Sequence, residues 1–162
     1  MEEWFAVYSR VRHEKAVLKE IQKKNFETYL PLMEQISHWK DRKKKVYLPL
    51  FPGYLFVKIN PKNSLEILKV PGVIRILGSN GKLIPVPSSQ IDGIKELLNS
   101  GLHYEISSKY VSGKEVEVIK GPLSGTTGKI INLKGNYKLI LSVDIINRSI
   151  LVEIDIDHVE IV

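Results

Sequence analysis

The spacing of apolar and polar residues changes soon after the start of the chain. Residues 4–9 are rich in aromatic and β-branched side chains, which predicts a strand. Over residues 12–24 the period lengthens, and charged residues surround a single apolar stripe that contains Val17, Leu18 and Ile21. This pattern is typical of an amphipathic helix, so a strand is expected to be followed by a helix.

Extended segments come next. Residues 26–39 are expected to be extended, with a bend or a sheet edge at Pro31, because proline cannot donate a ladder hydrogen bond. Residues 40–45 are too polar for a core and are expected at a hairpin tip. The apolar stretch that follows is interrupted by prolines and a glycine, and its second part, residues 54–59, predicts a strand.

The pattern to residue 100 completes the first domain. Asn60-Pro61 predicts the start of a short helix over 61–69. Strands over 73–77 and 83–86 are joined through an Asn-Gly turn, and a helix is expected over 89–98. The resulting order is β-α-β-β-α-β-β-α, which indicates an α+β domain with helices against a mostly antiparallel sheet.

The last third of the chain has a different composition. From residue 111, short Val- and Ile-rich segments alternate with turn residues, a pattern that predicts a small β-barrel. Residues 99–112 show no sustained period. We therefore expect a first domain over 1–100, a linker over 101–110 and a barrel over 111–162.

Charge distinguishes the two halves of this 162-residue chain. Residues 1–100 hold 17 Lys and Arg against 10 Asp and Glu, a balance of +7, whereas residues 101–162 hold 7 against 8, a balance of −1. This asymmetry predicts an anionic partner for the first domain, nucleic acid being the commonest, with a solvated basic face as the alternative. The chain contains no cysteine, begins with acidic residues and has no apolar run near 18 residues. These features predict a cytoplasmic protein without a membrane contact.

Two stretches resemble the NusG family of transcription factors. The first is PLFPGYLFV at 49–57, with VPGV at 70–73, Trp4, Tyr8 and the RHEK run at 12–15 around it; the second is VEVIKGPLSGTTGKI at 116–130. The resemblance implies an N-terminal NGN domain, a linker and a C-terminal SH3-like KOW barrel. It is nearest to the specialised paralogues of the LoaP, RfaH and UpxY type, around the HWKDRKK run at 38–44.

The resemblance implies that the NGN domain binds the clamp helices of the largest RNA polymerase subunit through an apolar face. The candidate residues for this contact are Tyr8, Leu30, Phe51, Tyr54 and Phe56. Strand alternation places Tyr54 and Phe56 on one face, which we expect to point outward, although at least half of the set is expected to be core. The 61–69 region would approach the opposite side of the polymerase cleft, with Asn63 and Ser64 as candidate contacts. By bridging the cleft in this way, the protein would suppress pausing or termination. It is expected to act as a monomer.

Basic residues are the candidates for a nucleic-acid contact. The specialised paralogues are recruited by exposed non-template DNA or by an RNA hairpin, and the long basic run here favours the RNA hairpin. Trp39 would stack on an unpaired base. The candidate residues are Arg10, Arg12, His13, Lys15, Trp39, Lys40, Arg42, Lys43, Lys44 and Lys45.

In the barrel, Pro122 and Leu123 lie in a glycine-rich turn, where an exposed apolar residue would indicate a protein partner. The resemblance implies ribosomal protein S10 as that partner. It argues against Rho, because Leu123 stands where many relatives carry a bulkier aromatic residue. The high density of Val and Ile favours a barrel over an alternative helical state.

No catalytic, metal or cofactor motif is found, and no enzyme activity is expected. The four histidines are far apart and lack ligand spacing, and neither a P-loop nor a G-x-S-x-G motif is present. Two alternatives to a recruited antitermination factor remain. One is a general NusG elongation factor, and the other is a ribosome-associated KOW-type protein that binds structured RNA.

Overall fold

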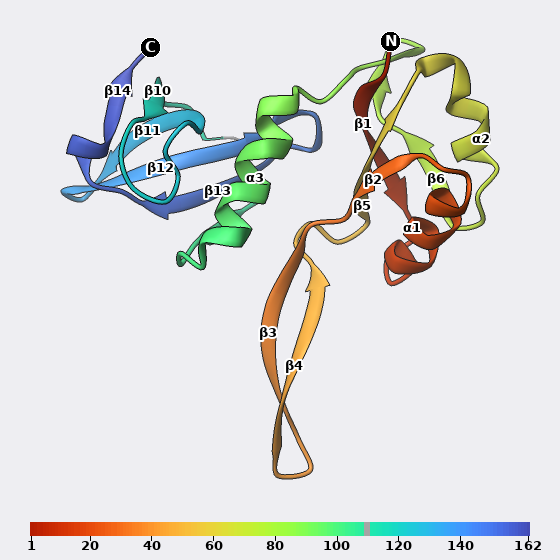
Figure 1. The fold of residues 1–162 in the computed structure, drawn as a ribbon, viewed down its shortest axis with the longest axis horizontal. Helices are drawn as coiled ribbons and strands as arrows, with labels where there is room; N and C mark the ends of the chain where they lie inside the picture. Colours follow the sequence, from red (N-terminus) through yellow and green to blue (C-terminus); the bar gives the residue numbers. More distant parts are fainter. Residues whose placement is uncertain (109–110) are drawn as a thin grey trace. The chain divides into compact units, whose positions relative to one another are not determined.

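The chain forms two compact units in a computed structural model that describes residues 1–108 and 111–162. The first unit spans Met1–Pro85 and the second Val86–Val162 (Figure 1). The first unit has the predicted α+β fold, and the second combines the predicted all-β sheet with one α-helix. Each unit is described by itself below.

The first unit is built on an antiparallel sheet with the strand order β2-β5-β1-β6. Its strands are β1 (Glu3–Ser9), β2 (Glu27–Tyr29), β5 (Tyr54–Ile59) and β6 (Val73–Ile76). Its helices are α1 (Glu14–Lys23) and α2 (Ser64–Leu68), the latter preceded by a 3-10 turn over Pro61–Asn63. The side chain of Asn60 caps that turn by accepting a hydrogen bond from the Lys62 amide at 3.1 Å, as the Asn-Pro pair predicts.

The main core of this unit lies on one face of the sheet. Alternate residues of β5 (Leu55, Val57 and Ile59) pack there against Val17 and Ile21 of α1, and all five are fully buried. Residues of β5 in between therefore point to the other face, which confirms the predicted alternation that separates Tyr54 and Phe56 from Leu55 and Val57.

A long hairpin extends from the first unit. β3 (Leu32–Trp39) and β4 (Arg42–Pro49) pair without interruption, and Lys40 and Asp41 form the turn with φ values of 44° and 64°. Positive φ at both central residues is the geometry of a type I′ turn, which follows the natural twist of two antiparallel strands. Figure 1 shows the pair as a twisted ribbon leading away from the sheet. The predicted basic tip is thus a two-residue turn plus the first half of β4.

A smaller hairpin joins β7 (Gly78–Ser79) to β8 (Lys82–Leu83). Its turn residues, Asn80 and Gly81, also have positive φ, as the Asn-Gly signal predicts.

The second unit consists of a helix and a six-stranded antiparallel sheet. The helix is α3 (Ser88–Ser100), and the strand order is β14-β10-β11-β12-β13-β9. The strands are β9 (Glu105–Ser107), β10 (Lys114–Val118), β11 (Thr127–Leu133), β12 (Asn136–Val143), β13 (Arg148–Glu153) and β14 (Val159–Ile161). Apolar residues such as Leu139, Ile150 and Val152 fill its interior.

The boundary between the units differs from the predicted domain boundary. α3 contacts β11 and β12, so it belongs to the second compact unit although the sequence pattern assigns it to the first domain. Part of the predicted linker, Glu105–Ser107, pairs with β13 as strand β9. Residues 109 and 110 of that linker lie outside the described residues. These contacts join positions far apart in the sequence, so local patterns carry no signal for them.

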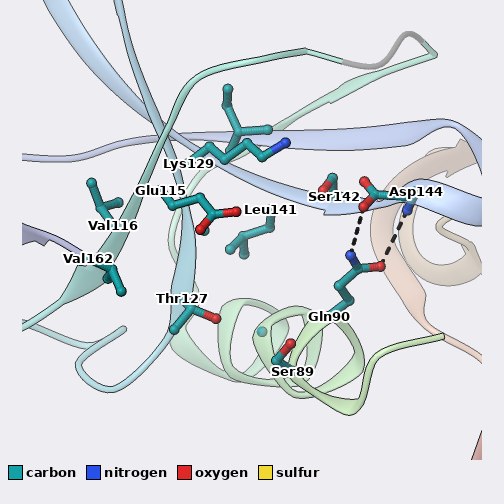
Figure 2. A pocket seen from close by; sticks show the side chains of 13 residues that line it. Ser89, Gln90, Glu115, Val116, Thr127, Lys129, Leu141, Ser142, Asp144 and Val162 are labelled. Atoms are coloured by element: carbon teal, nitrogen blue, oxygen red, sulfur yellow. Dashed lines mark hydrogen bonds between the residues drawn. The ribbon is translucent and has the colours of Figure 1, made fainter.

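Two polar contacts hold α3 on the barrel. The Gln90 side chain donates to a carboxylate oxygen of Asp144 at 3.1 Å and accepts from the Asp144 amide at 3.3 Å. Figure 2 shows this pair at the edge of a hollow of about 360 Å³, lined by residues of α3 and of the barrel strands. Gly93 lies at the crossing, where an added Cβ would be 3.4 Å from Thr126 Cγ2. The helix thereby covers part of the β11–β12 face.

Candidate functional site

The turn before β5 positions the aromatic candidates. The Tyr54 amide donates to the Phe51 carbonyl at 2.9 Å, with Pro52 and Gly53 at the central positions. Gly53 has a φ of +89°, which fits the third position of a type II turn, where glycine is favoured. The Leu50 amide donates to the Pro31 carbonyl at 2.8 Å, so the bend predicted at Pro31 lies against this turn.

Two segments hold the Gly53 peptide groups. Ser9, at the end of β1, donates its amide to the Gly53 carbonyl at 2.7 Å. Glu14, the first residue of α1, accepts the Gly53 amide on Oε2 at 2.8 Å. Ser9, Glu14 and Gly53 are all buried, so the backbone of the turn is tied to the interior.

Tyr8 and Tyr54 form the accessible part of the aromatic surface. They are directly opposite each other on β1 and β5, and their ring centroids are 5.1 Å apart with the planes tilted by 37°. Both side chains are half-buried, so each ring keeps a solvent-facing part. An added Cβ on Gly53 would be 3.0 Å from Tyr8 Cε1, so the turn packs closely against this pair.

The other aromatic and apolar candidates are buried. Phe56 is fully buried and Phe51 is 1% exposed, so the expectation that Phe56 points out to solvent is wrong. Phe56 shares the predicted face with Tyr54, but it lies opposite Ala6 on the two central strands of the sheet, and its side chain is fully buried. Leu30 belongs to the core cluster on the opposite face. Of the five candidates, Tyr8 and Tyr54 therefore present accessible surface.

Gly53→Ala is expected to destabilise the protein by about 1–3 kcal/mol, because an L side chain is strained at this φ and its Cβ would press on Tyr8. Gly81→Ala is the matched control, since Gly81 also has positive φ but its Cβ would meet nothing within 4 Å. The measurement is urea unfolding followed by Trp4 fluorescence in a Trp39→Phe background. Equal losses in the two variants would contradict a close contact between Gly53 and Tyr8.

The hairpin presents cations on both of its faces. Directly paired residues share a face, so Trp39, Arg42 and Lys44 lie on one side, and Lys43 and Lys45 on the other. Trp39 is 61% exposed, and the Lys40 ammonium lies 5.0 Å from the centroid of its ring. Lys45 differs from the others because its Nζ is 3.4 Å from a carboxylate oxygen of Glu34. A large part of the predicted nucleic-acid set is thereby brought onto one exposed ribbon.

The basic residues at the start of α1 form a second cationic surface. Arg10, Arg12, His13 and Lys15 are all exposed. The Lys15 ammonium donates to the Tyr47 carbonyl at 2.8 Å, which brings the start of α1 against the base of β4. The basic start of α1 thus contacts the base of the hairpin, whereas the basic run at 40–45 lies at and next to the hairpin tip, which extends away from the sheet (Figure 1).

A hollow beside α1 includes cations that were not among the candidates. Its volume is about 480 Å³, and its lining includes Arg10, His13, Lys19, Lys23 and Gly72. Lys19 and Lys23 are four residues apart and therefore lie on one side of the helix, a spacing that the sequence contains. Lys23 also pairs with Glu20 at 3.0 Å, so the hollow is cationic without being uniformly basic.

The α2 region offers apolar rather than polar surface. Asn63 and Ser64, the candidates there, are half-buried. Leu65 is 65% exposed and Leu68 is also exposed, and neither was a candidate. Their i, i+3 spacing on a short helix was a detectable signal.

In the barrel, the expectation that Leu123 is an exposed turn residue is wrong. Leu123 is only 2% exposed and belongs to the buried apolar set, because the turn folds its side chain inward. Pro122 is exposed and lines a hollow of about 200 Å³ together with Lys120 and His158. Pro122 is therefore the remaining candidate at this turn.

Within residues 1–108 and 111–162, no group of three or more His, Cys, Asp or Glu side chains could hold a metal ion. Over the same residues, no helix is long and apolar enough to cross a membrane. Burial raises the pKa of Tyr104 above its ordinary value.

Comparison with known proteins identifies relatives over nearly the whole chain. Residues 2–95 match the family described as NusG, transcription termination factor. A protein named transcription termination/antitermination protein NusG from Helicobacter pylori strain J99 is 28% identical over 173 residues, covering 99% of this chain and 98% of that relative. The protein of the same name from Thermus thermophilus is also 28% identical, covering 97% of both chains.

A solved structure supports the fold. The structure described as "Domain interaction in Thermotoga maritima NusG" matches with a TM-score of 0.56 and 22% identity, covering 100% of this chain and 98% of that one. At this identity, the likeness concerns the fold alone.

Proposed function

This chain belongs to the NusG family of transcription termination and antitermination proteins, and we propose that it is an antitermination factor recruited by a nucleic-acid element. Its relatives are named as transcription factors rather than enzymes. In the proposed function the protein performs no covalent chemistry. It binds RNA polymerase and stabilises the elongating state by contact alone.

The polymerase-binding part of the proposal rests on the Tyr8–Tyr54 surface. Two half-exposed aromatic rings, 5.1 Å apart and held by a buried turn, match the rigid aromatic anchors that dominate protein interfaces. A helix of the polymerase clamp would pack against this pair, as the family resemblance implies. The exposed leucines of α2 would provide a second contact across the polymerase cleft.

The hairpin supports recruitment by nucleic acid, and it is the observation that carries the proposal. It holds exposed cations on both faces and an exposed tryptophan beside its tip. Phosphates on both sides of such a ribbon can be contacted together when it enters a groove or a folded loop. An RNA hairpin, with a paired stem and unpaired bases for Trp39 to stack on, fits this combination better than an extended strand does.

The near-neutral barrel is proposed as the protein-binding half. Pro122 at its exposed turn supports contact with a protein partner, for which ribosomal protein S10 is the candidate. The burial of Leu123 removes one reason for expecting an apolar anchor there.

The full chain is expected to copurify with RNA polymerase and to bind an RNA hairpin at least tenfold more tightly than single-stranded DNA of equal length. The assay is a titration of both nucleic acids at several salt concentrations, because phosphate contacts make affinity salt-dependent. Tighter binding of the single-stranded DNA would indicate that the recruiting element is non-template DNA rather than an RNA hairpin. Structured-RNA binding without polymerase copurification would favour a ribosome-associated protein.

A further inference from the structure

A buried carboxylate lies directly behind the aromatic surface. Glu14 is 3% exposed, although it is a charged residue type in the first turn of α1, where most side chains face solvent. Acidic residues are seldom this buried unless they have a specific partner. Its partner is a backbone group, the Gly53 amide at 2.8 Å from Oε2.

That hydrogen bond determines the conformation of the turn. Gly53 is at the centre of the Phe51–Tyr54 turn, with positive φ, and its carbonyl accepts from the Ser9 amide at 2.7 Å. The Glu14 carboxylate satisfies the remaining donor of the same residue. Both polar groups of Gly53 are thus fixed by segments outside the turn, so its peptide planes cannot rotate without breaking one of these bonds.

The Phe51–Tyr54 turn also orients the aromatic pair. Tyr54 follows Gly53 immediately, and the Gly53 Cα lies close enough to Tyr8 that an added Cβ would be 3.0 Å from its ring. Rotation of the Gly53 peptide would therefore move the start of β5 relative to Tyr8 and change the 5.1 Å separation of the rings. A docking surface of two rings is sensitive to such a change, because an interface needs close complementarity at its anchors.

We infer that Glu14 is a positioning residue of the polymerase-binding surface: its buried carboxylate fixes the Phe51–Tyr54 turn and thereby holds Tyr54 against Tyr8. The inference rests on the proposed polymerase contact. It assigns to Glu14 an effect on binding although the side chain itself has almost no accessible surface.

The test compares two neutral variants of similar size in the full chain. Glu14→Gln keeps a carbonyl oxygen that can accept the Gly53 amide, whereas Glu14→Met has no good acceptor. Both remove the carboxylate charge from the first turn of α1, so their difference isolates the hydrogen bond. Ile21→Val, in the buried core and outside both proposed polymerase contacts, is the control for a small general loss of stability.

Two readouts are measured on each variant. The first is hydrogen exchange of the Gly53 amide relative to the amides of β5, and the second is affinity for purified RNA polymerase. In Glu14→Met we expect exchange at Gly53 to become about tenfold to a hundredfold faster, with little change within β5. Polymerase affinity should fall roughly tenfold in the same variant, and Glu14→Gln should restore both readouts to near the wild-type values.

Three results would overturn the inference. They are unchanged exchange at Gly53 in Glu14→Met, equal loss of protection throughout β5, and unaltered polymerase affinity despite faster exchange at Gly53. An equally large loss of polymerase affinity in the Ile21→Val control would be a further contradiction, because it would show that Glu14 affects binding only through general stability. Absence of polymerase binding by the wild-type chain would instead refute the proposed function, and the exchange comparison would still decide whether Glu14 fixes the turn.

Discussion

Tyr54→Ala is expected to weaken binding to RNA polymerase by roughly 30-fold or more while the protein remains folded. Aromatic residues at the centre of an interface commonly contribute 2 kcal/mol or more, which corresponds to about that factor. Tyr54 is half-buried and its ring lies beside Tyr8, so truncation removes contact surface without opening a large cavity in the core. The measurement is a titration of polymerase with each variant, with circular dichroism as the check on folding.

Two further substitutions make this result specific. Tyr47→Ala removes a ring of the same kind that is 49% exposed on the hairpin, and it should leave polymerase affinity within about twofold of wild type. Phe56→Ala removes a fully buried ring on the same face as Tyr54 and is expected to cost about 3–5 kcal/mol of stability. Normal polymerase binding by a folded Tyr54→Ala variant would exclude the aromatic pair from the interface.

The double variant Lys43→Ala/Lys44→Ala is expected to make nucleic-acid binding less sensitive to salt. Each phosphate contact contributes about 0.9 to the slope of log affinity against log salt for a duplex, so the slope magnitude should fall by about 1.8. Between 50 and 200 mM salt, the wild-type chain would then lose about 12-fold more affinity than the variant. Lys45 is left unchanged because it pairs with Glu34.

The matched control is Lys62→Ala/Lys82→Ala, which removes the same charge from exposed positions of the same unit outside the hairpin. Its slope should stay close to that of the wild type, because the effect on binding comes from local phosphate contacts rather than from net charge. The hairpin would be shown not to belong to the nucleic-acid interface if the slope is unchanged in the hairpin variant, or if both variants change the slope equally.

Much of the first unit follows from local sequence signals. The Asn-Gly turn at 80–81 is present as expected, and α1 ends at Lys23, close to the end of the helix predicted over 12–24. Alternation in β5 is also correct, because successive residues of any strand point to opposite faces. These features depend on neighbouring residues alone and are therefore readable from one sequence.

The candidate site was only partly predictable. The pairing of Tyr8 with Tyr54 requires the register of β1 against β5, and the role of Glu14 requires the Phe51–Tyr54 turn to lie against the start of α1. Glu14 appears in the sequence as one more charged residue beside Arg12 and Lys15. No local pattern distinguishes it from a solvated side chain.

By itself, the sequence determined the kinds of element, the α+β domain followed by a barrel, the basic first half and the likeness to the NusG family. Only the tertiary structure decided which residues of each apolar run are accessible: it buried Phe56 and Leu123 and left Tyr54 half-exposed. It also placed α3 on the barrel and β9 beside β13. The physical reason is that periodicity and turn chemistry act between neighbours along the chain, whereas burial depends on which distant segments cover a side chain.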